Sequence, residues 1–178
     1  MTESDFAELV ARACHDIRTP LAVAHGFART IERVGLDAAE APTFLGHVVS
    51  STKELDQLVV ALSTLAREQA GGLKLRPVDV ELNDLAAAAC ELAHGRLLGV
   101  EASIEPVHAE GTVVVARDAL VLAVADIAAS LVRAGAASVT VCGFEVATDD
   151  ADAGARLEEK ADLRLLAARA VLAASGVQ

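Results

Sequence analysis

Residues 44–65 read FLGHVVSSTKELDQLVVALSTL, and an apolar or small side chain recurs there at alternating intervals of four and three residues. The positions are Phe44, Val48, Ser51, Leu55, Leu58, Leu62 and Leu65. Strict alternation of three and four is the heptad pattern of helices that pack in a bundle. The stretch therefore predicts a long helix with one apolar face.

A second apolar stripe precedes this helix. Its members lie three or four residues apart, as on one face of a helix: Phe6, Val10, Ala13, Ile17, Leu21, Ala24, Phe27, Ile31 and Val34. Gly35 ends the stripe and residues 36–42 predict a turn, with Pro42 suited to the first turn of the next helix. We expect an antiparallel hairpin, and two copies of it forming a four-helix bundle across a two-fold axis. The alternative is a hairpin that packs only against its own chain.

The pattern changes after Gly72. We expect strands over 73–80, 100–104, 112–116 and 138–146, helices over 81–98, 118–134 and 158–175, and a polar loop over 148–154. Strands interleaved with helices predict a small sheet with helices on one face. The fold class is therefore α+β. A dimerising hairpin occupies residues 1–70 and a small α/β sandwich occupies residues 73–178.

Composition excludes several classes of function. The 178 residues include 15 basic and 26 acidic ones, a net charge of −11, and only 2% are aromatic. Phosphate backbones would be repelled and bases would find few stacking partners, so we expect no nucleic-acid binding. No stretch approaches about 18 uninterrupted apolar residues, and the start is polar and acidic instead of signal-like. We therefore expect no membrane binding. Three widely spaced cysteines suggest neither disulfides nor zinc, so we expect a cytoplasmic protein.

The segment CHDIRTPL, residues 14–21, contains the candidate reactive residues. On the first helix, His15 lies about 200° around from Ile17, so it faces water when Ile17 faces the bundle. Thr19 follows one turn later on the exposed face, and Arg12 precedes by nearly one turn. Pro20 has no amide hydrogen, so we expect the helix to bend there.

These residue types suit phosphoryl transfer. A neutral imidazole is a nucleophile toward phosphorus, and the carboxylate of Asp16 can accept its proton and fix its tautomer. The hydroxyl of Thr19 can hold a water molecule for the hydrolytic reaction. The alternative is a solvated surface histidine whose neighbours are there by chance.

Together the segment resembles the phospho-acceptor box of two-component histidine kinases: His, Asp or Glu, two variable residues, Thr or Asn, then Pro-Leu. Every position of that box is matched. The resemblance implies that His15 accepts the phosphoryl group, that Asp16 is the general base and that Thr19 orients water. We expect Arg12 and Arg18 to contact the partner.

The second domain is similar in layout to the ATP-binding domain of the same family, but its motifs are missing. Where the family has two Asn one turn apart, this chain has Asp126 and Ser130. Residues 152–154, Asp-Ala-Gly, echo the family's Asp-x-Gly box, yet we interpret Asp152 as a solvated loop residue. Residues 162–165, Asp-Leu-Arg-Leu, replace Gly-Leu-Gly-Leu, whose glycines let backbone amides approach the phosphates.

The resemblance therefore implies a histidine phosphotransferase that passes a phosphoryl group through His15 between receiver-domain aspartates without using ATP. Its partners would be response-regulator receiver domains, with a hybrid histidine kinase as one candidate, and no cofactor or metal is expected on this chain, since magnesium belongs to the receiver. Because only fourteen residues precede His15, we expect a free-standing relay protein. Three alternatives stay open: a divergent histidine kinase, a receiver phosphatase, and a non-catalytic scaffold that docks receiver domains.

Overall fold

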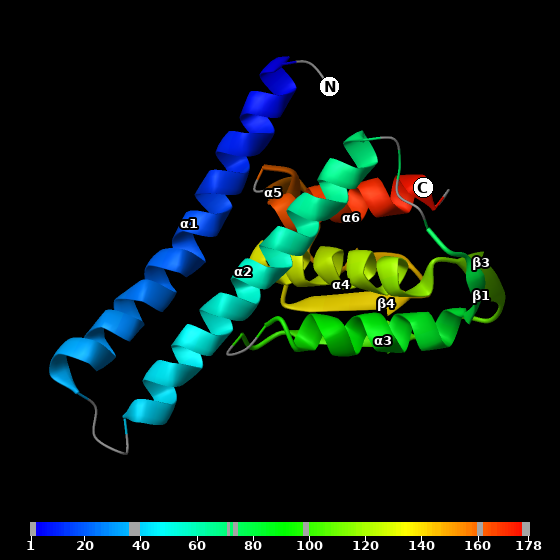
Figure 1. Ribbon diagram of the computed structural model, residues 1–178. Coiled ribbons are helices and arrows are strands. Elements are labelled where there is room, and N and C mark those ends of the chain that lie inside the picture. The colour runs from blue at the N-terminus through cyan, green and yellow to red at the C-terminus, as the bar shows by residue number, and fades with distance from the viewer. Residues whose placement is uncertain are drawn as a thin grey trace. The chain divides into compact units, whose positions relative to one another are not determined.

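The computed structural model describes residues 3–35, 40–70, 72, 75–97, 100–159 and 162–175 (Figure 1). The chain divides into two compact units, Met1–Ser63 and Thr64–Gln178. This division falls inside the second helix, whereas the predicted domains of residues 1–70 and 73–178 meet after that helix.

The first unit contains the predicted helical hairpin. Helix α1 spans Glu3–Val34 and helix α2, which continues into the second unit, spans Ala41–Gln69. Gly35 follows α1 with φ of 65°, and its amide donates to the carbonyl of Ile31 at 3.2 Å, which is a common way for a helix to end. Figure 1 shows the two helices running antiparallel, as the stripes predict.

Aromatic contacts join α1 to α2 near the turn. The ring of Phe27 lies 5.2 Å from that of Phe44 in an edge-on arrangement, and it stacks on the ring of His47 at 4.4 Å. Such ring pairs contribute about 0.5–1.5 kcal/mol beyond the apolar area that they bury. They fix the register of one helix against the other.

The second unit contains two small sheets. Strand β1 (Val78–Glu81) pairs antiparallel with β3 (Thr112–Val115). Strands β2 (Ser103–Val107), β4 (Ser138–Cys142) and β5 (Glu145–Thr148) form a mixed sheet in the order β2-β4-β5. In it β2 runs parallel to β4, and β5 runs antiparallel to β4.

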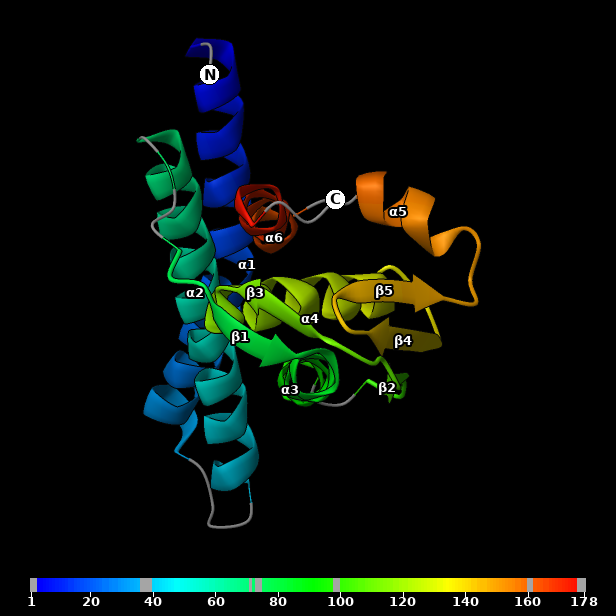
Figure 2. The ribbon, with the colours of Figure 1, turned by 90° about the vertical axis from the view of Figure 1, so that its right-hand side faces the viewer.

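Four helices accompany these strands: α3 (Leu82–His94), α4 (Arg117–Arg133), α5 (Ala153–Glu159) and α6 (Leu163–Ala174). Helices α3 and α4 pack side by side on the three-stranded sheet, and α6 packs against α4 (Figure 2). Their shared core consists of aliphatic side chains that are almost fully buried, among them Leu85, Leu120, Val124, Val139, Val141 and Leu165. The α+β class is confirmed.

Several predicted boundaries in this unit are wrong. The strand expected over 73–80 is only β1, with residues 73–74 outside the described part of the chain. The helix expected over 81–98 ends at His94, because Gly95 turns the chain and is a poor helix former. The strand expected over 100–104 is β2, which begins three residues later than predicted.

The single strand expected over 138–146 is a hairpin of β4 and β5. Gly143 and Phe144 form its two-residue turn, and Gly143 has φ of 62°, which glycine adopts without steric cost. A Cβ atom at this position would also approach Leu82 to 3.0 Å. A glycine as the first of two turn residues is the signal that could have revealed the hairpin.

The single helix expected over 158–175 is two helices, α5 and α6. The side chain of Asp162 accepts the amide hydrogen of Leu165 at 3.0 Å, so Asp162 is the N-cap of a new helix. Helix α5 begins at Ala153, inside the stretch that the sequence predicts as a loop. The apolar spacing continues across the break, which is why it suggested one helix.

Candidate functional site

The segment CHDIRTPL lies in the middle of α1, and the helix is continuous through Pro20. Pro20 is buried, and its missing amide hydrogen leaves the carbonyl of Asp16 without its usual helical partner. Ala13 is also buried, with 5% of its surface exposed, and Ile17 is half-buried. The helix therefore turns its apolar side inward at this point, as the stripe predicts.

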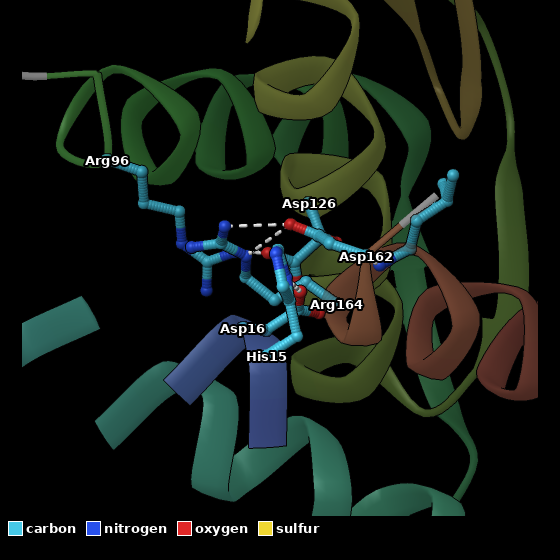
Figure 3. Close-up of polar contacts among 7 residues, drawn as sticks. His15, Asp16, Arg96, Asp126, Asp162 and Arg164 are labelled. Carbon is cyan, nitrogen blue, oxygen red and sulfur yellow. Dashed lines mark hydrogen bonds and ion pairs between the residues drawn. The ribbon is translucent and has the colours of Figure 1, made fainter. Parts of the chain in front are cut away.

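His15 lies on the opposite side of α1 and faces solvent, with 82% of its side chain exposed. Its Nδ1 atom lies 3.2 Å from Oδ1 of Asp16, whose side chain is only 16% exposed (Figure 3). A carboxylate oxygen facing Nδ1 favours the tautomer with the proton on that nitrogen. The lone pair of Nε2 is then free to react with a group that approaches from solvent.

The other predicted site residues surround His15 on α1. At about 100° per residue, Thr19 lies about 40° from His15 around the helix axis, and Arg12 and Arg18 lie about 60° to either side. Thr19 and Arg18 are exposed, while Arg12 is partly buried and pairs with Glu8 at 3.3 Å. Helix geometry thus places the hydroxyl and both cations on the face that presents the imidazole.

The two positions where the family has Asn are occupied by buried polar side chains on α4. Asp126 is 6% exposed and Ser130 is 7% exposed. The carboxylate of Asp126 forms an ion pair with the guanidinium of Arg96, which follows α3, and both side chains are less than a tenth exposed (Figure 3). Nothing in the sequence predicts a role for Arg96, since an isolated arginine thirty residues from its partner carries no local signal.

A second ion pair lies at the start of α6. Both Nε and Nη2 of Arg164 donate to Oδ2 of Asp162, at 3.0 and 2.7 Å, and the Arg164 side chain is 7% exposed. Burial lowers the pKa of Arg96 to about 10, and repulsion from Arg164 and Arg133 adds to this effect while attraction to Asp162 opposes it. We call Arg96, Asp126, Arg133, Asp162 and Arg164 the Arg–Asp cluster.

The echo of the family's Asp-x-Gly box has a structural role. Asp152 is exposed in the turn before α5, as predicted, and Gly154 lies within that helix. The amide of Asp152 donates to Oδ1 of Asp150 at 2.9 Å, and the carboxylate of Asp150 pairs with Arg156. Arg156 also donates from Nε to the carbonyl of Ala134 at 2.6 Å, so this turn is tied to the end of α4.

The described residues contain neither a membrane-spanning helix nor a metal-binding cluster. Within that part of the chain, no helix combines the length and the hydropathy needed to cross a membrane. No group of three or more His, Cys, Asp or Glu side chains is arranged there to hold a metal ion.

Comparisons with known proteins show what the helical hairpin is similar to. Residues 7–71 match the family model described as the His Kinase A (phospho-acceptor) domain. A 96-residue stretch, 52% of this chain, is 33% identical to a protein of Mycobacterium tuberculosis described as probable sensor histidine kinase TcrY. That stretch spans only 19% of the relative.

The fold is similar to that of a solved structure, the histidine kinase AdeS of Acinetobacter baumannii. The match has a TM-score of 0.60 at 16% identity and covers 90% of this chain and 86% of the other. His Kinase A domains function in two-component signalling with response regulators, and the predicted phospho-acceptor segment lies within the matched residues. Residues 7–71 thus match a His Kinase A phospho-acceptor domain, and the chain has a fold like that of a histidine kinase.

Proposed function

We propose that this chain is a histidine phosphotransferase, which carries a phosphoryl group on His15 between the aspartates of receiver domains and does not phosphorylate itself with ATP. The observation that carries the proposal is the exposed imidazole of His15 with its Nδ1 atom 3.2 Å from Asp16. A reactive nitrogen in open solvent is accessible to a second protein.

The transfer step follows from this geometry. The Nε2 lone pair of His15 attacks the phosphorus of an aspartyl phosphate, and the N–P bond forms as the acyl P–O bond breaks. The aspartate carboxylate leaves with the electron pair, and the Nδ1 proton is shared with or passed to Asp16. Reversal of these steps with a second receiver delivers the group. Magnesium bound by the receiver would neutralise the transferred oxygens.

Three neighbours have supporting roles in this proposal. The hydroxyl of Thr19 orients a water molecule that hydrolyses the phosphoryl group. Arg12 and Arg18, one on each side of His15, contact the acidic phosphorylation site of the receiver. Guanidinium groups suit this task because they pair with carboxylate and phosphate oxygens in a fixed geometry.

We also propose that the hairpin forms a homodimer. Several apolar side chains of the α1 stripe remain exposed on the single chain, at 54% for Phe6, 41% for Val10 and 53% for Leu21. Val10→Asp should weaken self-association, whereas Val23→Asp, at an equally exposed α1 position outside the stripe, should not. Sedimentation of both variants compares them, and an unchanged dimer for Val10→Asp would contradict the proposed interface. Leu58 suits this test poorly, because it is only 1% exposed within one chain.

The Arg–Asp cluster supports the absence of ATP chemistry. Asp126 and Ser130 replace the two expected Asn, and Asp126 is engaged by Arg96 instead of being available to a metal. A divergent histidine kinase is the second candidate, favoured by a fold match to a kinase that extends over 90% of the chain.

One experiment separates these candidates. The protein is mixed either with labelled ATP and magnesium or with a phosphorylated receiver domain, and acid-labile phosphate on the chain is measured. We expect label from the receiver only, and its loss in His15→Ala but not in His25→Ala, which removes another exposed histidine of α1. Label acquired from ATP alone would establish the kinase instead, and receiver label that survives in His15→Ala would exclude His15 as the carrier.

A further inference from the structure

Asn83, the second residue of α3, holds the connection between β2 and β3 with both ends of its side-chain amide. Its Oδ1 atom accepts the amide hydrogen of Ala109 at 2.8 Å, and its Nδ2 atom lies 3.1 Å from Nδ1 of His108. The thiol of Cys142 also donates weakly to the carbonyl of His108, at 3.9 Å. The proposed transfer reaction uses none of these groups.

The orientation of Asn83 decides which nitrogen of His108 carries the proton. A backbone N–H group can only donate, so the carbonyl end of the Asn83 amide faces Ala109 and its amino end faces His108. The amino group can only donate as well, which means that Nδ1 of His108 accepts. His108 is therefore neutral in this arrangement, with its proton on Nε2.

A second proton on the His108 ring is incompatible with this contact. It would place an N–H group of the ring against the amino group of Asn83, and turning the amide around would instead oppose two donors at Ala109. One hydrogen bond of the connection is lost whichever way Asn83 turns. The backbone bond from Leu82 to the carbonyl of Gly111, at 3.0 Å, involves no titratable group and should persist.

The His108 ring lies between Asn83 and an acidic side chain. Its Nε2 atom is 3.8 Å from Oε1 of Glu110, and the two side chains are 73% and 90% exposed. A protonated His108 would therefore meet a carboxylate on one side and the amino group of Asn83 on the other. The surrounding elements add four acidic groups and a thiol: Glu81 on β1, Asp84 on α3, Glu105 on β2, Glu145 on β5 and Cys142 on β4.

We propose that Asn83 and His108 form a pH-operated clamp, which holds residues 108–110 against α3 when His108 is neutral and releases them when it is protonated. Imidazole is the side chain that ordinarily changes charge between about pH 5 and 8, so we expect the release within that interval. The clamp does not depend on phosphotransfer through His15, so either proposal can fail without the other.

The test follows amide hydrogen exchange of the full chain by NMR at about pH 8 and about pH 5, corrected for the intrinsic effect of pH on exchange. Loss of one hydrogen bond should speed exchange at Ala109 about five- to tenfold at the lower pH. The amide of Leu82 is the internal reference, because its bond to Gly111 does not involve His108. An equal response of Ala109 and Leu82 to pH would overturn the proposal.

Three variants make the result specific. Asn83→Asp supplies a carboxylate that can accept from both Ala109 and a protonated His108, so acidification should no longer speed exchange at Ala109. His108→Phe removes both ring nitrogens and should also abolish the pH response. His94→Gln replaces an exposed histidine at the other end of α3 and should retain it. A response that survives in Asn83→Asp or His108→Phe, or that disappears in His94→Gln, would contradict the clamp.

Discussion

The His15–Asp16 pair and the Arg–Asp cluster use charged groups in opposite ways. His15 exposes 82% of its side chain and contacts one carboxylate, whereas Arg96 and Asp126 each expose less than a tenth. An exposed imidazole is free to change partners during a reaction. A buried ion pair is held in place, because separating it leaves an uncompensated charge in a poorly solvated interior. The comparison fits the proposed function, in which the first region reacts while the second is held in place.

The largest expected effect comes from breaking the buried pair. Asp126→Ala leaves Arg96 buried and without this partner, which should cost about 3–5 kcal/mol of unfolding free energy. Urea unfolding measures the loss. Asp118→Ala removes a carboxylate of the same helix that is 98% exposed, so it should change stability by no more than about 0.5 kcal/mol.

A double replacement tests whether Arg96 and Asp126 stabilise the fold as a pair. Arg96→Met combined with Asp126→Leu removes both charges and should recover most of the lost stability, because apolar side chains of similar volume often replace buried ion pairs without penalty. A double variant as unstable as Asp126→Ala would mean that the pair does not act as a unit. Where the variants remain folded, phosphoryl uptake by His15 should persist.

The next effect concerns the reactive pair. Asp16→Asn keeps a carbonyl oxygen near Nδ1 of His15 but cannot accept its proton, so the rate of phosphoryl uptake should fall about 100-fold. Rapid-quench measurements with a phosphorylated receiver give this rate, and Asp16→Glu, which retains the carboxylate, should keep much of it. A rate within twofold of the original for Asp16→Asn would exclude Asp16 as the base.

The two regions also differ in how well they could be predicted. Every feature around His15 lies on one helix, so residue spacing alone places Asp16, Thr19 and the two arginines on its exposed face. The Arg–Asp cluster joins three segments that are far apart in sequence. Asp126 drew attention only because it stands where the family has Asn. Nothing in the sequence connects Asp126 to Arg96.

The same contrast applies to the fold. The ends of α1 and α2 follow from Gly35, Pro42 and a sustained apolar spacing. Two element boundaries in the second unit depend on local features that the apolar pattern does not reveal. The turn at Gly143 separates β4 from β5, and the N-cap at Asp162 begins α6. The sequence therefore predicted the order of elements well but merged β4 with β5 and α5 with α6.

A smaller effect is expected at Thr19. Thr19→Ala should slow dephosphorylation of the receiver about five- to tenfold, the loss associated with one hydrogen bond, while uptake by His15 is unchanged. Thr19→Ser keeps the hydroxyl and should behave like the original. Phosphate release from the receiver measures this step, and slower uptake in Thr19→Ala would instead indicate that Thr19 helps to dock the receiver.

The smallest effect should come from Asp150. Its ion pair with Arg156 is partly buried, so it lies between the exposed His15–Asp16 pair and the buried Arg–Asp cluster. A hydrogen bond from Arg156 lowers the pKa of the Asp150 carboxyl below its ordinary value, with a smaller contribution from the amide of Asp152. A lowered pKa in the folded state stabilises the fold above the ordinary value of about 3.9, and this contribution disappears as the pH falls through the folded-state pKa. Asp150→Asn should therefore lower the thermal midpoint modestly at pH 7 and leave it nearly unchanged below about pH 3. The same loss at both pH values, or an equal loss in Asp149→Asn at the exposed neighbouring carboxylate, would show that charge pairing with Arg156 does not hold this turn.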